Sequence, residues 1–327
     1  MLILDGHKLN YHADRVAAWQ HGERIAPITI DMALTRACTY KCQYCYSQLQ
    51  YNPSKELTWP ILLRFLDDCV EIGVKAISLV SDGESTCHKD WVDFIVAGKF
   101  RGIDMALGTN GFLITEEDLR NVLPHLTYIR FNISAADSYI YSKLHGCNEF
   151  CYVKVIDNIK NAVRIKKKNN LNVTIGLQKV LWDNLNQIIP LAKLGKDLGV
   201  DYFVIKHCSD DENNALKSVN IFDEKFLMNQ LKAAEQLSSK DYQVSAKWSK
   251  IFSKGRSYVH CYGPPFIMQL SGSGLVAPCG MLFAKKYEKY HIGNIANISF
   301  KELWQSDRYW EVMRLLAEEH DPKSMCG

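Results

Sequence analysis

The sequence predicts an α/β fold in which parallel strands and helices alternate to form an open, partial barrel. From about residue 28 to residue 207, short runs rich in β-branched and aromatic residues alternate with longer stretches of helical periodicity. This alternation is typical of right-handed β-α-β units and a parallel sheet. Six such units are too few for a closed eight-stranded barrel. We therefore expect a partial (β/α)6 TIM-like barrel with its active site at the carboxyl ends of the strands.

Each unit is predicted from its own pattern. The expected strands are residues 28–34, 76–80, 103–107, 128–133, 173–180 and 202–205. The expected helices are residues 57–72, 89–99, 116–122, 151–168 and 185–198. The basic run at residues 164–168 ends one of these helices, where cations complement the helix dipole. We interpret it as a solvated helix end rather than an RNA-binding patch.

The pattern changes after the sixth strand. Residues 211–250 are polar with helical periodicity, residues from 258 onward are rich in aromatics, glycine and proline, and another amphipathic helix is predicted near residues 300–319. The expected domain organisation is as follows: an N-terminal extension at 1–27, the barrel at 28–210, a helical linker at 211–255, and a small auxiliary domain at 256–327.

Composition is that of an ordinary globular protein. The 327 residues are 47% hydrophobic and carry a net charge of +3, which favours neither nucleic acid nor a membrane surface. No apolar run approaches the roughly 18 residues of a membrane span, and the N-terminus lacks a signal-peptide pattern. Eleven cysteines in such a chain predict a reducing, cytoplasmic location with thiols used for metals or chemistry.

The most informative motif is Cys38-x3-Cys42-x2-Cys45, with Tyr44 before the last cysteine. It follows the first predicted strand. Three thiolates can hold three irons of a [4Fe–4S] cluster and leave the fourth iron open, as a catalytic metal site requires. A zinc site or three unrelated buried thiols is the alternative. The motif resembles the signature of the radical SAM superfamily. The resemblance implies that the open iron chelates S-adenosylmethionine, whose reductive cleavage gives a 5′-deoxyadenosyl radical that abstracts hydrogen from substrate.

A second resemblance follows the second predicted strand. Asp82, Gly83 and Glu84 match the family's "GGEP" motif, which holds the methionine amino group. Asp82 replaces the first glycine and Ser85 replaces the proline, so the match is partial. Gly83 permits close backbone approach, and Glu84 can accept hydrogen bonds from an ammonium group.

The next three strand ends also match loosely. Thr109 begins a "TNG" sequence, and Ser134 lies in a segment that resembles the family's "vSlDa". The resemblance places Ser134 against the ribose or carboxylate of S-adenosylmethionine, with Asn132 on the same face of the strand. It places the backbone at Ile175 and Gly176 against the adenine. Taken singly, each segment reads as an ordinary strand end, but together they occur in the family's order.

A second metal site is predicted near the C-terminus. The pattern Cys261-x12-Gly274-x4-Cys279 and the later "GNI…W" resemble the SPASM or shorter "twitch" domain. The resemblance implies an auxiliary [4Fe–4S] cluster held by Cys261, Cys279 and Cys326. The second cysteine of the family's CxxC pair is missing after Cys326. Either the sequence is truncated, or a fourth ligand comes from elsewhere. Buried thiols or a zinc pair are the alternative.

Catalytic residues are expected after the sixth strand. Cys208 faces the predicted mouth of the barrel, where it could donate a hydrogen atom to a substrate radical, although an inert buried thiol is as good an interpretation. Lys206, His207 and Asp210 share this strand end and are candidate proton acceptors for an oxidation.

The sequence therefore predicts a radical SAM enzyme that oxidises, epimerises or cross-links its substrate. The family resemblance implies a peptide or a small sugar or aminocyclitol substrate, and a flavodoxin- or ferredoxin-type reductant. No winged-helix peptide-recognition domain is recognisable at the N-terminus, which mildly disfavours a leader-dependent peptide enzyme. A non-catalytic scaffold with zinc or a structural cluster is the alternative from another class. Modification of tRNA or a nucleotide is disfavoured by the near-neutral charge.

Overall fold

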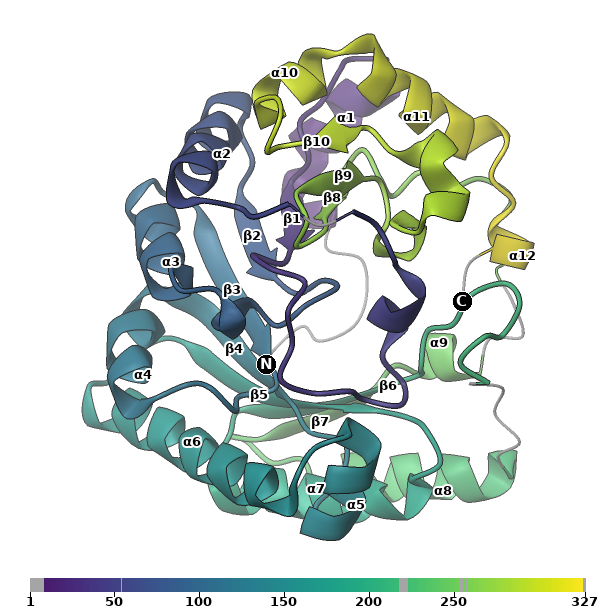
Figure 1. Ribbon diagram of the computed structural model, residues 1–327. Helices are drawn as coiled ribbons and strands as arrows, with labels where there is room; N and C mark the ends of the chain where they lie inside the picture. Colours follow the sequence, from purple (N-terminus) through teal and green to yellow (C-terminus); the bar gives the residue numbers. More distant parts are fainter. Residues whose placement is uncertain (1–8, 54, 218–222, 253–255, 257, 326–327) are drawn as a thin grey trace.

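A single curved sheet organises the protein. The computed structural model describes residues 9–53, 55–217, 223–252, 256 and 258–325. The ten strands are ordered β10-β9-β8-β1-β2-β3-β4-β5-β6-β7. Strands β8 and β1 to β7 pair in parallel, and β9 and β10 are antiparallel to their neighbours. In Figure 1 the strands curve around a central opening with the helices outside, which confirms the predicted partial barrel.

The elements have the following bounds. The strands are β1 Thr29–Met32, β2 Ala76–Leu79, β3 Asp104–Thr109, β4 Leu126–Asn132, β5 Thr174–Val180, β6 Tyr202–Lys206, β7 Gln243–Ala246, β8 Ile267–Leu270, β9 Leu275–Ala277 and β10 Gly293–Asn294. The helices are α1 Ala13–Gln20, α2 Trp59–Ile72, α3 Trp91–Phe100, α4 Glu116–Val122, α5 Ser138–His145, α6 Glu149–Lys168, α7 Ile188–Leu198, α8 Glu224–Glu235, α9 Trp248–Ile251, α10 Phe300–Gln305, α11 Asp307–Glu318 and α12 Pro322–Met325.

The six predicted strands are confirmed as β1 to β6, and the predicted barrel helices as α2, α3, α4, α6 and α7. Local signals fix their ends. The Thr115 side chain accepts a hydrogen bond from the Asp118 amide and forms a capping box at the start of α4. Gly73, with φ of 91°, ends α2 in the left-handed conformation that glycine adopts without strain. The basic run ends α6, as predicted.

Two expectations about secondary structure are wrong, and one helix was not predicted. Helix α5 was not predicted, because it has only eight residues between its Asp137 cap and Gly146. The stretch at 211–250 is not helical throughout, because residues 243–246 form β7 beside β6. The single helix expected near residues 300–319 is two helices. Ser306 adopts an extended conformation, with ψ of 150°, and its side chain caps α11.

The sheet separates an apolar layer from a polar one. On β4, Ile129 and Phe131 are fully buried in the hydrophobic core, which includes residues of α4 and α6. The alternate residues of the same strand, Tyr128 and Arg130, line a cavity inside the barrel. Because side chains of a strand alternate between its two faces, the barrel interior is free to carry functional polar groups.

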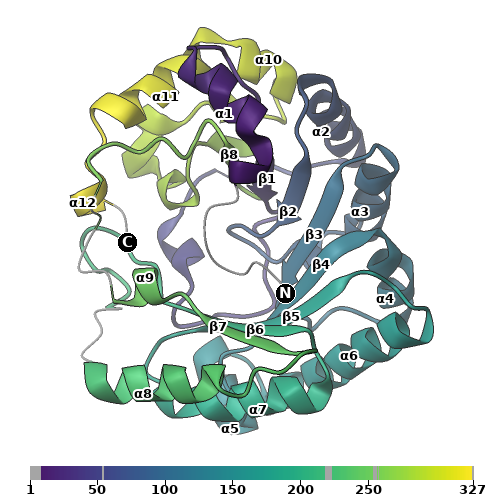
Figure 2. The same cartoon turned by 180° about the vertical axis from the view of Figure 1, so that it is seen from behind.

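The C-terminal region joins the same sheet. Strand β8 pairs in parallel with β1, from Thr29 opposite Ile267 onward. The Phe300 amide of α10 donates to the Asp68 carboxylate of α2 at 2.7 Å. Figure 2 shows from behind how β8 and α1 continue the arc of strands and helices. The sheet therefore continues across the domain boundary expected near residue 255.

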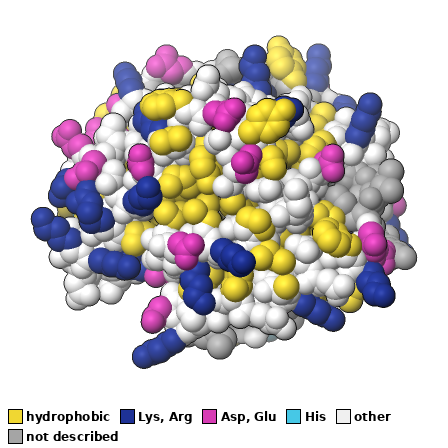
Figure 3. All heavy atoms as spheres, turned by 90° about the horizontal axis from the view of Figure 1, so that it is seen from below, with side chains coloured by type: hydrophobic (Ala, Val, Ile, Leu, Met, Phe, Trp, Pro, Cys, Tyr) yellow, Lys and Arg dark blue, Asp and Glu magenta, His cyan; other side chains and the backbone are white. Residues whose placement is uncertain are grey.

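On the face shown in Figure 3, charged side chains of one sign do not gather into a single patch. Hydrophobic side chains gather in the middle of that face, and basic and acidic side chains are interspersed around them. Among the described residues, no helix is both long and apolar enough to span a membrane.

Candidate functional site

The three motif cysteines gather in one cavity at the carboxyl ends of the strands. Cys38, Cys42 and Cys45 line a cavity of about 290 Å³ together with Ser81 and Gly83 from the end of β2. In Figure 1 the loop that carries them crosses the central opening between β1 and α2. The structure thus brings together the motifs that follow the first two strands, as predicted.

Contacts with α5 hold the cysteine loop in place. The Lys41 and Gln43 amides donate to the backbone carbonyls of His145 and Leu144 at 3.1 and 2.9 Å. Gly146, directly after α5, has φ of 58°, and a Cβ there would lie 2.5 Å from the Lys41 carbonyl oxygen. The loop therefore needs glycine at the end of the unpredicted helix.

Each cysteine sulfur has a polar neighbour. The Tyr40 amide donates to Cys38 Sγ at 3.5 Å, and the Ser47 hydroxyl lies 3.0 Å from Cys45 Sγ. His145 Nδ1 lies 3.3 Å from Cys42 Sγ. Hydrogen bonds of this kind stabilise thiolates and adjust the reduction potential of a bound cluster.

The cavity fits a [4Fe–4S] cluster. Burial raises the pKa of the Cys38 thiol to about 11 and holds the pKa of Cys42 above its usual range, with each neighbouring sulfur adding to the effect on Cys42. A bound metal would reverse this effect, because a coordinating thiol is deprotonated outright. The described residues contain no group of three His, Cys, Asp or Glu side chains suited to one metal ion. Cluster ligands bind separate irons and need not converge on one point.

One buried hydroxyl in this cavity lacks a protein partner. Ser81 Oγ is buried, and no hydrogen-bonding group of the described residues reaches it. Buried hydroxyls are normally paired, so an orphan in a cavity is suited to a polar ligand. The sequence analysis missed Ser81, whose position directly before Asp82 was its only signal.

Gly83 serves a close contact between backbones. A Cβ at Gly83 would lie 1.9 Å from the Thr35 carbonyl oxygen, and a Cβ at Gly272 would lie 2.1 Å from the Thr35 carbonyl carbon. The cysteine loop is thus clamped between the end of β2 and the turn after β8. The expected close approach at Gly83 is real, and its partner is Thr35.

The Asp82 side chain is engaged within the protein, and a contact of this position with the cofactor stays a prediction. The Asp82 carboxylate accepts hydrogen bonds from the Ser271 hydroxyl at 2.6 Å and the Gly272 amide at 2.8 Å. It also pairs with Arg36, whose Nε lies 3.3 Å away. An aspartate replaces glycine here because it ties the C-terminal turn to the end of β2.

Glu84 and Thr109 are hydrogen-bonded to each other. The Glu84 carboxylate accepts hydrogen bonds from the amides of Thr86 and Asn110 at 3.2 and 2.7 Å, and from the hydroxyls of Thr86 and Thr109 at 2.8 and 2.9 Å. Three of these donors share Oε1 and only the Asn110 amide reaches Oε2, so Oε2 can accept a further hydrogen bond. Asn110, which the sequence analysis did not single out, faces the cysteine loop, with Nδ2 at 3.1 Å from Thr39 Oγ1.

Tyr44 covers Ser134. Their hydroxyls lie 2.8 Å apart, and Ser134 is fully buried. The Ser134 carbonyl accepts from Lys179 Nζ and Asn184 Nδ2, both at 2.9 Å. Ser134 is therefore a structural link beneath the cysteine loop, and its expected contact with ribose or carboxylate would require Tyr44 to move.

The two remaining cofactor candidates lie on the inner face of the barrel. Asn132 Oδ1 accepts from Gln178 Nε2 at 3.0 Å. A Cβ at Gly176 would lie 2.0 Å from the Tyr202 ring, so this glycine makes room for an aromatic side chain of β6. The Tyr202 ring explains why this position needs glycine. A contact between Gly176 and adenine stays a prediction.

The candidate catalytic residues diverge after β6. Cys208 is buried, its Sγ lies 3.6 Å from the Tyr44 carbonyl oxygen, and burial raises the pKa of its thiol to about 12. Lys206 and His207 line the barrel cavity. The Asp210 carboxylate accepts from the Asp211 and Leu216 amides at 2.8 and 3.0 Å and so shapes its own loop. The role of Asp210 as a proton acceptor stays a prediction.

The C-terminal cysteines are described only in part. Cys279 lies close enough to Tyr46 of the cysteine loop to raise the pKa of that phenol, after the larger effect of burial. Tyr46 donates to the Met281 carbonyl at 3.1 Å. Cys261 is half-buried next to Tyr262, which packs against Trp19. Cys326 lies outside the described residues. Ten described cysteines are all free thiols.

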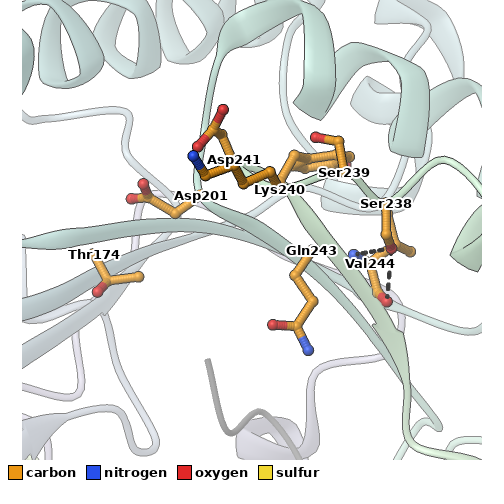
Figure 4. A pocket seen from close by; sticks show the side chains of 9 residues that line it. Thr174, Asp201, Ser238, Ser239, Lys240, Asp241, Gln243 and Val244 are labelled. Carbon is orange, nitrogen blue, oxygen red and sulfur yellow. Dashed lines mark hydrogen bonds between the residues drawn. The ribbon is translucent and has the colours of Figure 1, made fainter. Parts of the chain in front are cut away.

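Another cavity lies at the opposite end of the strands. Its volume is about 770 Å³, and it is lined by Thr174, Asp201, Gln243 and the loop before β7. In Figure 4 Asp241 and Lys240 project on one side of the strands, and Gln243 on the other. Asp201 already pairs with Lys166 at 2.6 Å. Barrel enzymes use the carboxyl ends of their strands, so we place the site at the cysteines.

Comparison with known proteins agrees with this placement. Residues 32–192 match the family model described as the Radical SAM superfamily, and residues 261–327 match SPASM, described as an iron-sulfur cluster-binding domain. The AdoMet-dependent heme synthase of Methanosarcina barkeri is 25% identical over 330 residues, which cover 92% of this chain and 88% of the relative. A tungsten-containing aldehyde ferredoxin oxidoreductase cofactor-modifying protein of Pyrococcus furiosus is 21% identical over 297 residues, covering 85% and 81%.

Solved structures agree on the fold. Streptococcus suis SuiB bound to S-adenosylmethionine superposes with a TM-score of 0.70 at 16% identity, covering 93% of this chain and 72% of SuiB. SuiB bound to the precursor peptide SuiA gives a TM-score of 0.68 at 16% identity, covering 98% and 74%. The two matched domains are thus a radical SAM domain and an iron-sulfur cluster-binding domain, and both imply [4Fe–4S] clusters. With the cysteine cavity at the mouth of a partial barrel, these matches identify the chain as an enzyme of the radical SAM superfamily with a C-terminal SPASM domain.

Proposed function

We propose that this enzyme cleaves S-adenosylmethionine at a cluster held by Cys38, Cys42 and Cys45, and abstracts hydrogen from a peptide or small-molecule substrate. The supporting observation is that these three thiols line one cavity against the end of β2. When bound, the cluster supplies the electron that cleaves the sulfonium and yields a 5′-deoxyadenosyl radical. The net reaction would be an oxidation, an epimerisation or a cross-link.

The chain's own residues position the reactants. The orphan Ser81 hydroxyl and the backbone at Gly83 offer polar contacts for the amino-acid part of S-adenosylmethionine. Glu84 keeps the ends of β2 and β3 together, and its Oε2 could also accept a hydrogen bond from the amino group of S-adenosylmethionine. A cavity of about 500 Å³ inside the barrel offers room for substrate next to the cysteines.

Several finer points extend the proposal. Cys261, Cys279 and Cys326 would hold an auxiliary [4Fe–4S] cluster, and the Tyr46–Met281 contact would couple that region to the cysteine loop. A flavodoxin- or ferredoxin-type protein would supply electrons in a reducing cytoplasm. A peptide substrate is supported by SuiB, solved with a precursor peptide, and a small molecule by the heme synthase. A small sugar or aminocyclitol would be a substrate of the small-molecule class.

The test is metal content together with cleavage of S-adenosylmethionine. The protein is purified anaerobically and reconstituted with iron and sulfide, beside a Cys38→Ala/Cys42→Ala/Cys45→Ala variant. About eight irons falling to about four in the variant, with loss of 5′-deoxyadenosine formation, would support both clusters. About four falling to none would remove the auxiliary cluster from the proposal. Zinc in place of iron would refute the enzyme and favour a metal-binding scaffold.

A further inference from the structure

A second group of cysteines lies next to the cysteine loop, at the start of α6. Cys147 precedes the Asn148 cap of this helix, and Cys151 lies in its first turn. Their side chains are hydrogen-bonded to each other. Neither residue belongs to the motif at 38–45 or to the cysteines near the C-terminus. The proposed function therefore leaves this dithiol without a role.

The two thiols of this pair differ in exposure. Cys147 is half-buried, whereas Cys151 is 8% exposed and belongs to the hydrophobic core. The thiol that solvent reaches can react with a small oxidant in solution. The shielded thiol beside it can then displace the first product and close a disulfide. The pair thus has the arrangement of an attacking cysteine and a resolving cysteine.

Only a small movement is needed to join the two sulfurs. Residues four apart on a helix have Cβ atoms about 5–6 Å apart, and a disulfide needs about 3.5–4.5 Å. The Cys151 amide donates to the Asn148 carbonyl at 2.9 Å within the first turn of α6. Cys147 lies outside the helix, and its amide donates to the Ser142 carbonyl of α5 at 3.0 Å. Cys147 can therefore approach by roughly 1–2 Å without breaking the helical hydrogen bonds of α6.

The protonation state of the pair favours a stable disulfide that forms slowly. Burial, then the neighbouring Cys151, raises the pKa of the Cys147 thiol to about 12. The reduced pair therefore gains no stability from a thiolate. A thiol of high pKa is also a poor leaving group when the disulfide is attacked. Because the thiolate is the nucleophile, exchange at neutral pH is slow in the oxidising direction as well.

Cys147 also contacts the cysteine loop. The Tyr141 hydroxyl donates to the Tyr40 hydroxyl at 3.3 Å, which leaves the proton of Tyr40 for its side-chain hydrogen bond to Cys147. Tyr40 belongs to the loop, and its amide donates to Cys38 Sγ at 3.5 Å. On the other side, Gly146 directly precedes Cys147 and packs against the loop backbone. A displacement of Cys147 toward Cys151 therefore acts on the loop through two contacts.

We propose that Cys147 and Cys151 are a reversible modification site, at which a small disulfide oxidises the dithiol and thereby loosens the cysteine loop. Cys147 attacks the small disulfide and releases one thiol from it. Cys151 then displaces the second thiol as the intrachain S–S bond forms. The two cysteines lose two electrons and two protons, which convert the small disulfide into two thiols. The effect on the loop rests on the proposed function, whereas the disulfide rests on the pair alone.

Peptide mapping tests the modification. The reconstituted enzyme is incubated anaerobically with glutathione disulfide, quenched with acid, alkylated and digested. Trypsin cleaves after Lys143 and Lys154, so the peptide 144–154 contains both cysteines and no others. We expect this peptide without alkyl groups, and its two halves should separate after cleavage at Glu149 only when dithiothreitol is added. Two alkylated cysteines, or glutathione on Cys147 without a linkage to Cys151, would overturn the proposal.

Variants separate the disulfide from other oxidation. Cys151→Ser should carry glutathione on Cys147 and form no linkage. Cys87, which is half-buried like Cys147, is the matched control, and Cys87→Ser should leave the linkage unchanged. Loss of the linkage in a folded Cys87→Ser variant would contradict the assignment.

Iron release measures the effect on the loop. The oxidised wild type should transfer iron to a ferrous chelator several-fold faster than the reduced wild type. The same oxidant should not accelerate release from a Cys147→Ser/Cys151→Ser variant. Equal rates from the oxidised and reduced wild type would overturn the effect on the loop. Cleavage of S-adenosylmethionine without a disulfide would refute only this inference, and a disulfide without such cleavage would refute only the proposed function.

Discussion

Replacing His145 separates two hydrogen bonds that one imidazole makes. His145 Nε2 accepts a hydrogen bond from the Ser134 amide at 3.2 Å, and Nδ1 lies 3.3 Å from Cys42 Sγ. A backbone amide can only donate, so Nε2 carries the lone pair. Burial, then the nearby Lys179, lower the pKa of His145 to about 3, so the ring is neutral. The single ring proton therefore sits on Nδ1 and points to the cysteine sulfur.

Two isosteric variants divide these contacts. The amide nitrogen of His145→Asn can occupy the place of Nδ1, so it keeps the donor to Cys42 and leaves the Ser134 amide unpaired. His145→Gln reaches the place of Nε2, so it keeps the acceptor for Ser134 and loses the donor to Cys42. An unpaired buried amide costs about 1–3 kcal/mol, so His145→Asn should lower the free energy of unfolding by that amount.

The reduction potential should follow the opposite order. A hydrogen bond to a charged group contributes about 1.5–3 kcal/mol. We take about half of this energy to depend on the electron that the cluster gains on reduction. Loss of the bond then shifts a one-electron potential by about 30–60 mV. We expect His145→Gln to move the potential of the Cys42-ligated cluster to more negative values, and His145→Asn to leave it near that of the wild type. A redox titration followed by electron paramagnetic resonance measures this. An unchanged potential in His145→Gln would refute the argument and would assign the proton to the Tyr44 hydroxyl, 3.4 Å from Nδ1.

Three further predictions concern the surroundings of the site. Gly83→Ala should destabilise the protein by more than the roughly 1–3 kcal/mol of ordinary overpacking, because its Cβ would meet the Thr35 carbonyl, and thermal unfolding measures this. Asp82→Ala should lower the free energy of unfolding by about 3 kcal/mol in denaturant titrations, because it removes the carboxylate beside Arg36 and the acceptor of the Ser271 hydroxyl and the Gly272 amide; a change below 1 kcal/mol would contradict this. Burial holds the pKa of Lys179 well below its usual value, so the unfolded state binds more protons than the folded state. The free energy of unfolding therefore rises with pH up to about 10.4, by at most about 1.4 kcal/mol per pH unit. Lys179→Met should flatten that rise, and parallel slopes for variant and wild type would contradict it.

The sequence predicted the barrel because long-range order in this fold follows local patterns. Short strands such as β2 appear as apolar runs, and two of the predicted barrel helices, α4 and α6, begin at a side-chain cap. Strand β7 has only four residues and no strong apolar run, so its pairing with β6 depends on tertiary contacts. The break at Ser306 was also not predicted. One side-chain cap there interrupts an otherwise continuous amphipathic pattern.

The candidate site was predicted best where its residues lie close together in the sequence at a spacing that the metal chemistry requires. Cys38, Cys42 and Cys45 belong to one loop, so their spacing alone indicated their assembly. The roles of Asp82 and Ser134 were not predictable in this way, because each depends on a partner remote in sequence: Ser271 for Asp82, and Tyr44 for Ser134. His145 gave no signal, since its helix was not predicted.

The central position of β1 has a consequence for how the protein is made. Strand β1 bonds to β2 on one side and to β8 on the other, so its neighbours come from the beginning and the end of the chain. While the chain is being synthesised, one edge of β1 stays open until β8 leaves the ribosome. Open strand edges are templates for association with other chains, and distant pairings form slowly. The nascent barrel thus passes through an aggregation-prone stage, and its last step is the arrival of the region that carries Cys279.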